Sequence, residues 1–575
     1  MCGISGILNH NNARVLTEKM ISAQHHRGPD SNGLYSGSDG RVCLGHNRLS
    51  IIDLSENGKQ PMYSSDNRYV IVFNGELYNY REIREELKHT FEFKTQTDTE
   101  VVLKAWIKWG KDCLDKFLGM FAFAIWDLEK EVLFAARDRF GVKPFHFSKV
   151  GDTLAFASEI KAIWETGLLE KEPAEDMWAE YFVNARYDHT RSTFWKGVEK
   201  LDAGSYFTWS LKEGLHISKW YSLSEKIVPD SRSEADVMDE LLSLLEDSVK
   251  LRFRADVPVG ICLSGGVDSS LLFALVQRIK GKDFPVHAFT FYTDDDRYDE
   301  LPWVQQIIKG SSAVLHKCLL RADSIPGMAE RLSGFMDEPY GGIPTLGMSR
   351  VFETAAESGI TVLLDGNGID EGWAGYDYYR TAEEVDFNRG PVQQAKQQVY
   401  LSQTLKKDFL DFLPSSAPQR FHPDPLLNLQ IRDIVQTKIP RSMRFADRNS
   451  MANSLELREP FLDHRIIELG LNQPASVKVN GREGKLLVRE LAKKLIPEHI
   501  SAAPKRGVQT PQREWLANEL SPWVEEELEK MLTGKFGHWF IKDKVNEQWR
   551  AYLSGRYDNS FFIWQWLNFS IMNYL

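Results

Sequence analysis

The chain is organised around one stretch, Val257-Pro258-Val259-Gly260-Ile261-Cys262-Leu263-Ser264-Gly265-Gly266-Val267-Asp268-Ser269-Ser270. Its first seven residues form an apolar run that predicts a short, buried parallel strand. The residues that follow predict a helix, because apolar side chains recur on one face at Leu271, Leu272, Leu275, Val276 and Ile279. A Ser/Gly-rich turn between a strand and a helix presents backbone N–H groups at the positive end of the helix dipole. The stretch therefore predicts an anion site, at which glycines allow close approach of phosphate oxygens and Ser264, Ser269 and Ser270 add hydroxyl donors.

Asp268 is out of place in a loop that only binds anions. We interpret it as a ligand that holds Mg²⁺ against the same phosphates. No lysine follows the glycines, so this is not the usual nucleotide P-loop. The loop resembles instead the pyrophosphate-binding SGG-x-DS loop of ATP pyrophosphatases, which split ATP into AMP and pyrophosphate to adenylate a substrate. The alternative is an ordinary Ser/Gly turn, but strand, loop, acid and helix occur together in the order expected of that family.

The composition is that of a soluble enzyme. The chain has 575 residues, of which 42% are hydrophobic and 26% charged, and this length allows roughly two to four domains. No apolar run reaches transmembrane length, and no signal peptide is recognisable at the N-terminus. The net charge of −11 argues against non-specific nucleic-acid binding. Five cysteines, at positions 2, 43, 113, 262 and 318, show no metal-ligand spacing, so we expect a cytoplasmic protein with reduced thiols, no nucleic-acid partner and no membrane association.

Cys2 can become the N-terminal residue, because the initiator methionine is normally removed when a small residue follows it. The residue then carries both a thiol and a free α-amine. An α-amine has a pKa of about 7.7–8.0, close enough to neutrality to act as the base for its own side chain. Taken alone, however, Cys2 is more simply a cysteine that happens to stand second.

Further motifs in the first hundred residues change this interpretation. They are Met1-Cys2-Gly3-Ile4-Ser5-Gly6-Ile7, His26-Arg27-Gly28-Pro29-Asp30, Gly45-His46-Asn47-Arg48-Leu49-Ser50-Ile51, Phe73-Asn74-Gly75-Glu76-Leu77-Tyr78-Asn79 and Thr97-Asp98-Thr99-Glu100. In this order they resemble the glutaminase domain of class II glutamine amidotransferases, an N-terminal-nucleophile fold with two stacked sheets. The resemblance covers residues 2–210.

This resemblance implies a role for each polar residue in the motifs. The Cys2 thiolate attacks the γ-carboxamide of glutamine. The side-chain amide of Asn74 and the backbone N–H of Gly75 form the oxyanion hole, in which loss of one donor typically costs about 100- to 1000-fold in rate. The expected glutamine-binding residues are Arg48 for the α-carboxylate, Asp98 with Glu76 for the α-ammonium, and Asn74 with Gly75.

The two halves of the chain have different patterns. Strand-length apolar runs at Phe121–Trp126 and Val132–Ala136, with a last hairpin between Leu201 and Tyr221, fit a sandwich. After the polar segment Ser224–Glu234, strands alternate with helices, which predicts a parallel sheet. We therefore expect an α+β N-terminal-nucleophile sandwich of two stacked antiparallel sheets at residues 2–225, the glutaminase domain. An α/β domain with a parallel sheet of ATP-pyrophosphatase type, the synthetase domain, is expected at residues 230–575.

The second half contains a helix expected at Glu234–Phe253, and further strands are expected at Val286–Phe291, Ala313–Leu320 and Ile360–Leu364. The last strand ends in Asp365-Gly366-Asn367-Gly368-Ile369-Asp370-Glu371-Gly372. Asp370 is placed to share with Asp268 the magnesium that bridges the phosphates.

Later motifs at Asp447–Met451, Leu455–Asp463 and Gly484–Arg489, taken with the first half, resemble the glutamine-hydrolysing asparagine synthetases over nearly the whole chain. By this resemblance Lys485 contacts the ATP phosphates and helps to carry developing charge, which makes it catalytic. Without this resemblance, Lys485 would be interpreted as a solvated lysine of a helix. The expected ATP-binding residues are Leu263, Ser264, Gly265, Gly266, Asp268, Ser269, Phe289 (through its backbone), Asp365, Gly366 and Lys485; the expected metal ligands are Asp268 and Asp370.

The chain departs from this family near the acceptor site. Asparagine synthetases usually have Ser-Gly-Glu-Gly where this chain has Asp365-Gly366-Asn367-Gly368, and the Gly341-Gly342 pair removes side-chain bulk nearby. Four aromatic residues follow, Trp373, Tyr376, Tyr378 and Tyr379, which either offer a surface to a large ligand or belong to the core. These departures favour an acceptor larger than aspartate, such as a hexuronic acid derivative, whereas the overall resemblance favours aspartate.

The resemblance implies a ligase with two active sites. Glutamine is hydrolysed at Cys2, ammonia passes internally, ATP adenylates a carboxylate in the presence of Mg²⁺, and ammonia displaces AMP to give a carboxamide. The partners are then glutamine, ATP and a carboxylate acceptor, with a homodimer left open. Two other classes remain: a non-catalytic relative that senses nucleotide or glutamine, which the intact motifs argue against, and a ring-closing enzyme of β-lactam-synthetase type, which would lack the N-terminal cysteine.

Overall fold

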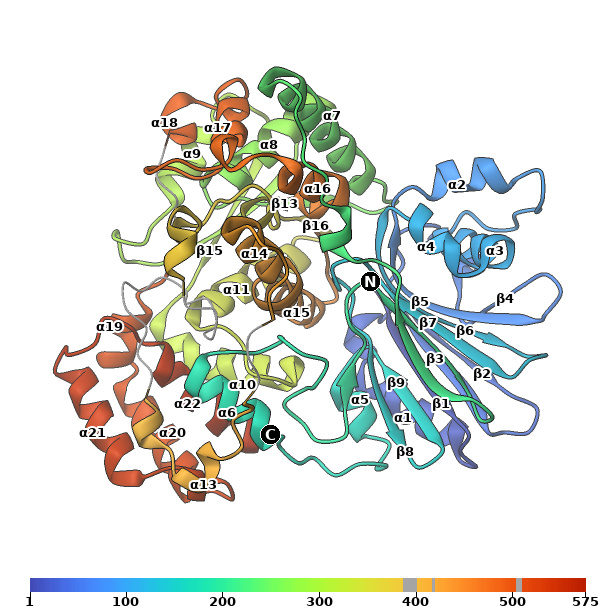
Figure 1. The fold of residues 1–575 in the computed structure, drawn as a ribbon, viewed down its shortest axis with the longest axis horizontal. Coiled ribbons are helices and arrows are strands. Elements are labelled where there is room, and N and C mark those ends of the chain that lie inside the picture. The colour runs from blue at the N-terminus through green and yellow to red at the C-terminus, as the bar shows by residue number, and fades with distance from the viewer. Residues whose placement is uncertain (386–400, 416–418, 503–508, 575) are drawn as a thin grey trace.

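Two six-stranded antiparallel sheets form the N-terminal half of the chain (Figure 1). The computed structural model describes residues 1–385, 401–415, 419–502 and 509–574. The first sheet has the order β10 (Glu199–Lys200), β8 (His146–Val150), β9 (Thr153–Ala157), β1 (Gly3–Leu8), β3 (Val42–Arg48), β2 (Ser31–Ser36). The second has the order β12 (Gly214–Lys219), β11 (Ser205–Ser210), β7 (Val132–Arg137), β6 (Gly119–Asp127), β5 (Tyr69–Leu77), β4 (Met62–Tyr63). The predicted sandwich is confirmed, as are the strands around Phe121–Trp126 and Val132–Ala136 and the last hairpin.

The apolar core of the sandwich lies between the two sheets. Buried side chains such as Ile4, Leu44, Val72 and Ala124 meet there, because alternate residues of each strand point inward. Helix α1 (Ala13–Ala23) covers the outer face of the first sheet, with α5 (Ile160–Trp164) beside it. Helices α2 (Tyr80–Leu87), α3 (Asp98–Trp109) and α4 (Cys113–Lys116) pack outside the second. Cys2 thus stands directly before β1 of one sheet, while Asn74 and Gly75 lie in β5 of the other.

A five-stranded parallel sheet forms the centre of the second half, as predicted. Its order is β15 (Val314–Leu319), β14 (His287–Tyr292), β13 (Val259–Cys262), β16 (Val362–Leu364), β17 (Glu456–Arg458). The chain runs outward from β13 through β14 to β15, then returns to the other side of β13. In parallel sheets, ligands bind at the carboxyl ends of the strands where the order reverses. That point lies beyond β13 and β16, and it brings the Ser264–Ser270 loop next to Asp365.

Helices surround this sheet. The predicted helix around Glu234–Phe253 is α7 (Glu234–Arg252), and α8 (Val267–Lys280) follows the Ser/Gly loop. The others near the sheet are α9 (Leu301–Ile308), α10 (Ile325–Met336), α11 (Ile343–Glu357), α12 (Ile369–Gly372), α14 (Pro425–Arg432), α15 (Ile439–Met451), α16 (His464–Asn472), α17 (Leu486–Lys493) and α18 (Glu498–Ser501). In the described part of the chain, no helix combines the length and apolar character needed to cross a bilayer.

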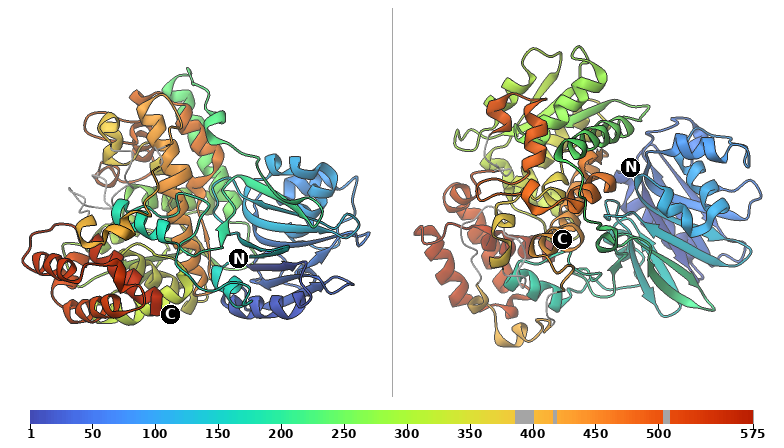
Figure 2. Two further views of the ribbon diagram at one scale, coloured as in Figure 1. Left: turned by 60° about the horizontal axis from the view of Figure 1, so that its bottom comes forward. Right: turned by 45° about the horizontal axis from the view of Figure 1, so that its top comes forward.

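The last helices of the chain pack against a helix of the N-terminal half (Figure 2). They are α19 (Gln512–Ala517), α20 (Ser521–Thr533), α21 (Lys542–Leu553) and α22 (Phe561–Tyr574), and with α13 (Lys407–Leu410) they enclose α6 (Glu175–Asn184). The rings of Trp178 and Phe569 lie 4.8 Å apart, and the Asn568 side chain donates to the Tyr181 hydroxyl at 2.9 Å. The expected boundary between domains near residue 225 therefore does not separate two independent cores.

Arg27 joins the two halves through a buried ion cluster. Its guanidinium, which is 0% exposed, donates to Asp447 of α15 at 2.8 and 3.1 Å and to Glu159 at 2.9 Å. Its Nε also donates to the carbonyl of Cys2 at 3.0 Å. Glu159 also lies 2.6 Å from the Lys161 ammonium and 2.9 Å from Arg448, whereas Asp447 forms its ion pair with Arg27. Burial opposes a lower pKa of Asp447, but the charge and hydrogen bonds of Arg27 outweigh it and lower that pKa.

We expect Arg27→Met to lower the free energy of unfolding by about 3–5 kcal/mol, since it leaves the buried Asp447 carboxylate without its ion-pair partner. The measurement is urea denaturation followed by circular dichroism. Arg14→Ala is the control, because the Arg14–Glu18 pair is exposed and such pairs contribute at most about 1 kcal/mol. Equal effects of the two substitutions would contradict the role given to the cluster.

Candidate active sites

The backbone of Cys2 is held by the residue predicted to stabilise the oxyanion. The Cys2 N–H donates to the side-chain oxygen of Asn74 at 3.0 Å, and the Cys2 thiol lies 3.9 Å from the Leu49 carbonyl. Cys2 is only 8% exposed, and burial raises the pKa of its thiol. Met1 precedes it, also buried, and its ammonium lies 3.2 Å from Glu456 of β17.

The two predicted oxyanion-hole residues, Asn74 and Gly75, are consecutive in β5. The side-chain nitrogen of Asn74 is buried and has no hydrogen-bond partner among the described residues, as expected of a donor kept for a ligand. Gly75 has a φ of +156°, and a Cβ there would lie 2.1 Å from the Met120 carbonyl of β6. Only glycine lets the two strands approach this closely while β5 keeps that backbone conformation.

The residues predicted to receive the α-ammonium belong to a group of buried carboxylates. Asp98 accepts a hydrogen bond from Leu77 N at 2.8 Å, and burial raises its pKa to about 6. The pKa of Glu76 is raised by burial and then by Glu456. Arg458 lies 2.5 Å from Glu456 and 3.5 Å from Glu76. The sequence predicts no role for Glu456 or Arg458, although both lie in the motif Leu455–Asp463, because no sequence spacing shows that β17 reaches this pocket.

Arg48 is close enough for its charge to lower the pKa of Cys2, although burial outweighs it. Its guanidinium donates to the carbonyls of Ser55, at 2.7 Å, and Asp53. A Cβ on Gly58 would lie 2.0 Å from one guanidinium nitrogen, so that glycine makes room for the arginine. Arg48 also borders, with Leu49 and Ser50, an open cavity of about 380 Å³.

The Ser/Gly loop has the strand–turn–helix geometry that the sequence predicts. Gly265 has a φ of +73°, and a Cβ there would lie 2.8 Å from Trp303 of α9. Ser264 and Ser269 lie within hydrogen-bond distance of each other, 3.1 Å between their hydroxyls, and Ser269 and Ser270 both donate to the Gly266 carbonyl. Phe289 is buried, and its carbonyl accepts from Leu263 N at 2.9 Å, so its side chain offers no ligand surface.

The two predicted metal ligands converge on Lys485. Its ammonium lies 2.6 Å from carboxylate oxygens of both Asp268 and Asp370. Two carboxylates that lie this close to one cation are also suited to bind a metal cation that is held against phosphates. Oxygens of the nucleotide would complete the ligands of that metal. Within the described residues there is no group of three or more His, Cys, Asp or Glu side chains with metal-site geometry.

Glycines make this convergence possible. A Cβ on Gly375 would lie 1.8 Å from an Asp370 oxygen and 2.7 Å from Lys485 Cε, and one on Gly484 would lie 2.2 Å from the Ala374 carbonyl. Lys485 itself has a left-handed backbone, with φ +58°. The alternative interpretation of Lys485, as a solvated helix lysine, does not hold, since Lys485 is 2% exposed and is held at the start of α17.

The two departures from the family in the 365–368 loop are partners of each other. The Asn367 side chain donates to one oxygen of Asp365 at 2.6 Å, and Gly366 N donates to the other at 2.7 Å. Asp365 N in turn donates to the Arg458 carbonyl at 2.9 Å. Burial raises the pKa of Asp365 to about 6. The substitutions thus close the loop on itself beside Asp268.

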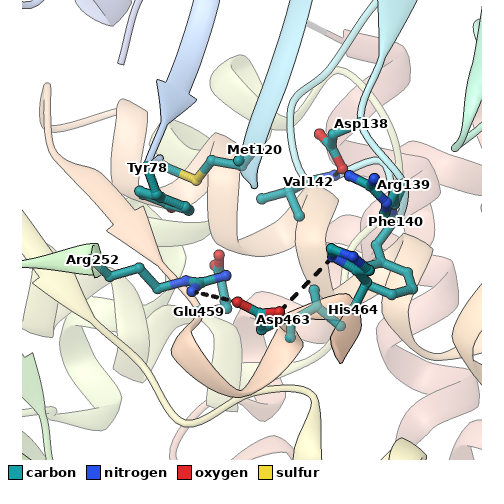
Figure 3. A pocket seen from close by; sticks show the side chains of 12 residues that line it. Tyr78, Met120, Asp138, Arg139, Phe140, Val142, Arg252, Glu459, Asp463 and His464 are labelled. Carbon is teal, nitrogen blue, oxygen red and sulfur yellow. Dashed lines mark hydrogen bonds and ion pairs between the residues drawn. The ribbon is translucent and has the colours of Figure 1, made fainter. Parts of the chain in front are cut away.

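A small cavity lies between the two halves of the chain (Figure 3). Its volume is about 20 Å³, somewhat more than the roughly 10–15 Å³ that one water-sized molecule requires. Tyr78 and Met120 from the N-terminal half face Arg252 and Glu459 across it. The remaining lining residues are Gly119, Asp138, Arg139, Phe140, Val142, Leu462, Asp463 and His464.

Comparison with known proteins assigns both halves. The family described as glutamine amidotransferase domain matches residues 1–221, and the family described as asparagine synthase matches residues 240–574. The chain belongs to the glutamine-hydrolysing asparagine synthetase family. Asparagine synthetase (glutamine-hydrolysing) 1 of Bacillus subtilis is 29% identical over 99% of this chain and 96% of its own length, and synthetase 3 of the same organism is 30% identical over 87% and 85%. Amidase chyE of Penicillium rubens is 28% identical over 90% and 89%.

Two features that suggested a larger acceptor than is usual in this synthetase family have structural explanations. The space beside Gly342 is filled by Gln512, whose side-chain oxygen accepts from Ile343 N at 2.7 Å. Trp373 and Tyr379 are core residues, 0% and 1% exposed. Tyr376 and Tyr378 are half-buried and stack at 5.5 Å, with their hydroxyls bonded to Glu371 and Asp433.

We expect Gly375→Ala to abolish ATP cleavage and leave glutamine hydrolysis intact, because the new methyl group collides with Asp370 and displaces Lys485. Pyrophosphate release and glutamate formation measure the two activities. Gly481→Ala is the matched control, since a Cβ there meets no atom within 4 Å. Normal pyrophosphate release by Gly375→Ala would contradict the packing described for Lys485.

Proposed function

We propose that this protein transfers the amide nitrogen of glutamine to a carboxylate that ATP has activated as an acyl-adenylate. The observation that carries the proposal is the presence, in one chain, of a Cys2–Asn74–Gly75 arrangement and an Asp268–Asp370–Lys485 arrangement, with a cavity lined by residues of both halves of the chain. Activation is needed because a carboxylate is a poor electrophile and its oxygen a poor leaving group.

In the glutaminase half, removal of Met1 frees the α-amine of Cys2 and the space that Met1 occupies. That amine then takes the proton of the thiol. The thiolate attacks the γ-carboxamide carbon, and the negative oxygen that forms is stabilised by Asn74 Nδ2 and the Gly75 N–H. Asp98 and Glu76 hold the α-ammonium and Arg48 the α-carboxylate. Ammonia leaves, and water hydrolyses the thioester to glutamate.

In the synthetase half, the Ser/Gly loop holds the ATP phosphates with its N–H groups. Asp268 and Asp370 are the residues that would hold Mg²⁺, which when bound neutralises charge on the phosphates and orients them. Lys485 then exchanges its carboxylate partners for phosphate oxygens. It carries part of the negative charge that develops as the acceptor carboxylate attacks the α-phosphate and pyrophosphate leaves.

The cavity is the proposed path of ammonia between the two sites. Tyr78 and Met120 line it, and the Met120 carbonyl packs against Gly75 of the proposed oxyanion hole. On the other side, Glu459 follows Arg458, whose carbonyl binds Asp365 N. A cavity that admits only a water-sized molecule suits ammonia and excludes both glutamine and the acceptor.

Aspartate is the acceptor that we propose. The Bacillus relatives that align over most of their length carry the name asparagine synthetase. The hexuronic acid alternative has lost support, because Gln512 fills the space beside Gly342 and two of the four aromatics are buried in the core. A relative of equal similarity is named an amidase, so the acceptor needs a direct test: pyrophosphate release and amide formation with a panel of carboxylic acids that includes aspartate and hexuronates.

Cys2→Ala should abolish amidation with glutamine while free ammonia still supports it, because the two sites perform separate chemistry. Amide formation is measured with each nitrogen source. A folded variant that is inactive with ammonia as well would show that the sites are not separable in this way.

Asp268→Asn and Asp370→Asn should each abolish pyrophosphate release and amide formation but leave glutamine hydrolysis in place. Each change removes a charged oxygen from a site whose ligand is itself polyanionic. Normal pyrophosphate release by either variant would exclude the assignment of these residues to the ATP site.

A further inference from the structure

Glu459 is a buried carboxylate that neither half-reaction uses. It is 4% exposed and follows the last residue of β17. Its side chain lines the interdomain cavity (Figure 3). Among the described residues none forms an ion pair or a side-chain hydrogen bond with its carboxylate, which is unusual for a buried acid.

The two other carboxylates that line the cavity, Asp463 and Asp138, have partners. Asp463 lies 3.2 Å from Arg252 and 3.0 Å from Arg465, and its pKa is held well below the usual range, although burial opposes the arginines. Asp138 accepts backbone N–H groups of Phe121, Phe140, Val142 and Lys143. Burial lowers the pKa of His464 to about 3, so this histidine is neutral and a weak base.

Glu459 differs from them in its proton affinity. Burial raises its pKa to about 8, against the attraction of Lys143 and Arg252 and with the repulsion of Asp365 and Asp447. A group with a pKa near the working pH is suited to exchange protons during catalysis. The charged and titratable groups that surround it are Lys143, Asp365 and Asp447, together with Tyr78, Asp138, Arg139, Arg252, Asp463 and His464 of the cavity wall.

The position of Glu459 fits the end of the ammonia route. Tyr78 and Met120 border the same cavity on the glutaminase side, and the peptide group before Glu459 is bonded to the 365–368 loop beside Asp268. A small nitrogen nucleophile that crosses the cavity therefore meets this carboxylate before it reaches the nucleotide loop.

We propose that Glu459 is the base that accepts the proton lost by the nitrogen as the carboxamide forms. The inference rests on the function proposed above. The lone pair of ammonia forms the N–C bond to the acyl carbon, and the C–O bond to the phosphate breaks, so that its electron pair leaves with AMP. One proton passes from nitrogen to the Glu459 carboxylate and later to solvent, which leaves the neutral amide.

The test is Glu459→Gln, which keeps the size of the side chain but cannot accept the proton. Loss of a positioned base typically costs about 100- to 10,000-fold. Amide formation should fall by this factor with glutamine and with ammonia alike, while glutamine hydrolysis and acceptor-dependent pyrophosphate release are retained. In the wild type, amide formation should rise with pH up to about 8, because the base must be deprotonated; the variant should lose this rise. His464→Gln, in the same cavity wall, should behave as the wild type.

Wild-type amide formation and an unchanged pH profile in Glu459→Gln would overturn the proposal. If that variant also loses glutamine hydrolysis, Glu459→Asp decides: a retained pH-dependent rise supports the base, and loss of both activities shows a structural residue and overturns it. Failure of the wild type to form an amide from any acid, with both half-reactions active, would instead refute the proposed function.

Discussion

The pairing of β17 with β16 is the contact on which both candidate sites depend. It spans only three residues on each strand, Val362–Leu364 against Glu456–Arg458. Leu363 and Leu457 of this pair are buried in the sheet, whereas the side chains of Glu456 and Arg458 reach the N-terminal ammonium and Glu76 of the other half. At the end of the same strand pair, the Arg458 carbonyl accepts a hydrogen bond from Asp365 N of the 365–368 loop. A displacement of β17 would therefore change the contacts of both candidate sites, although the two sites share no side chain.

Close packing around Lys485 imposes a second constraint. The lysine can lie between two aspartates only because glycines at 375 and 484 remove side chains from the approaching loops. Its ammonium, 2.6 Å from an oxygen of each, offsets the repulsion between the neighbouring carboxylates of Asp268 and Asp370. In the proposed function the same ammonium exchanges these carboxylates for phosphate oxygens of ATP.

The sequence predicted the strands and the phosphate loop well, since short apolar runs and a Ser/Gly turn are local signals. Long-range features were beyond it. No pattern in residues 455–463 predicts a strand as short as β17 or its pairing with β16. The packing of α22 on α6 brings together residues that are 384 and 387 positions apart. In the sequence, Asp365 and Asn367 are two separate departures from the family pattern. The structure shows that their side chains are hydrogen-bonded to each other. The role of the aromatic residues at 373–379 is ambiguous in the sequence, because residue type alone does not show whether a side chain is buried.

The charge of the glutaminase pocket explains why a substrate with an α-ammonium suits it. Glu76, Asp98 and Glu456 are buried together, and the pKa values of Glu76 and Asp98 are raised, first by burial and in both cases by Glu456 as well. Arg458 compensates mainly Glu456, which it approaches at 2.5 Å, against 3.5 Å for Glu76. Arg458 thus gives Glu76 and Asp98 less positive charge than it gives Glu456. In the proposed function an entering α-ammonium supplies the remainder, which lowers the pKa of both carboxylates and releases protons that burial makes them hold. We expect such binding to strengthen as the pH rises through the pKa of about 6 of Asp98, and in the proposed function these buried acids favour an amino acid over a simple amide.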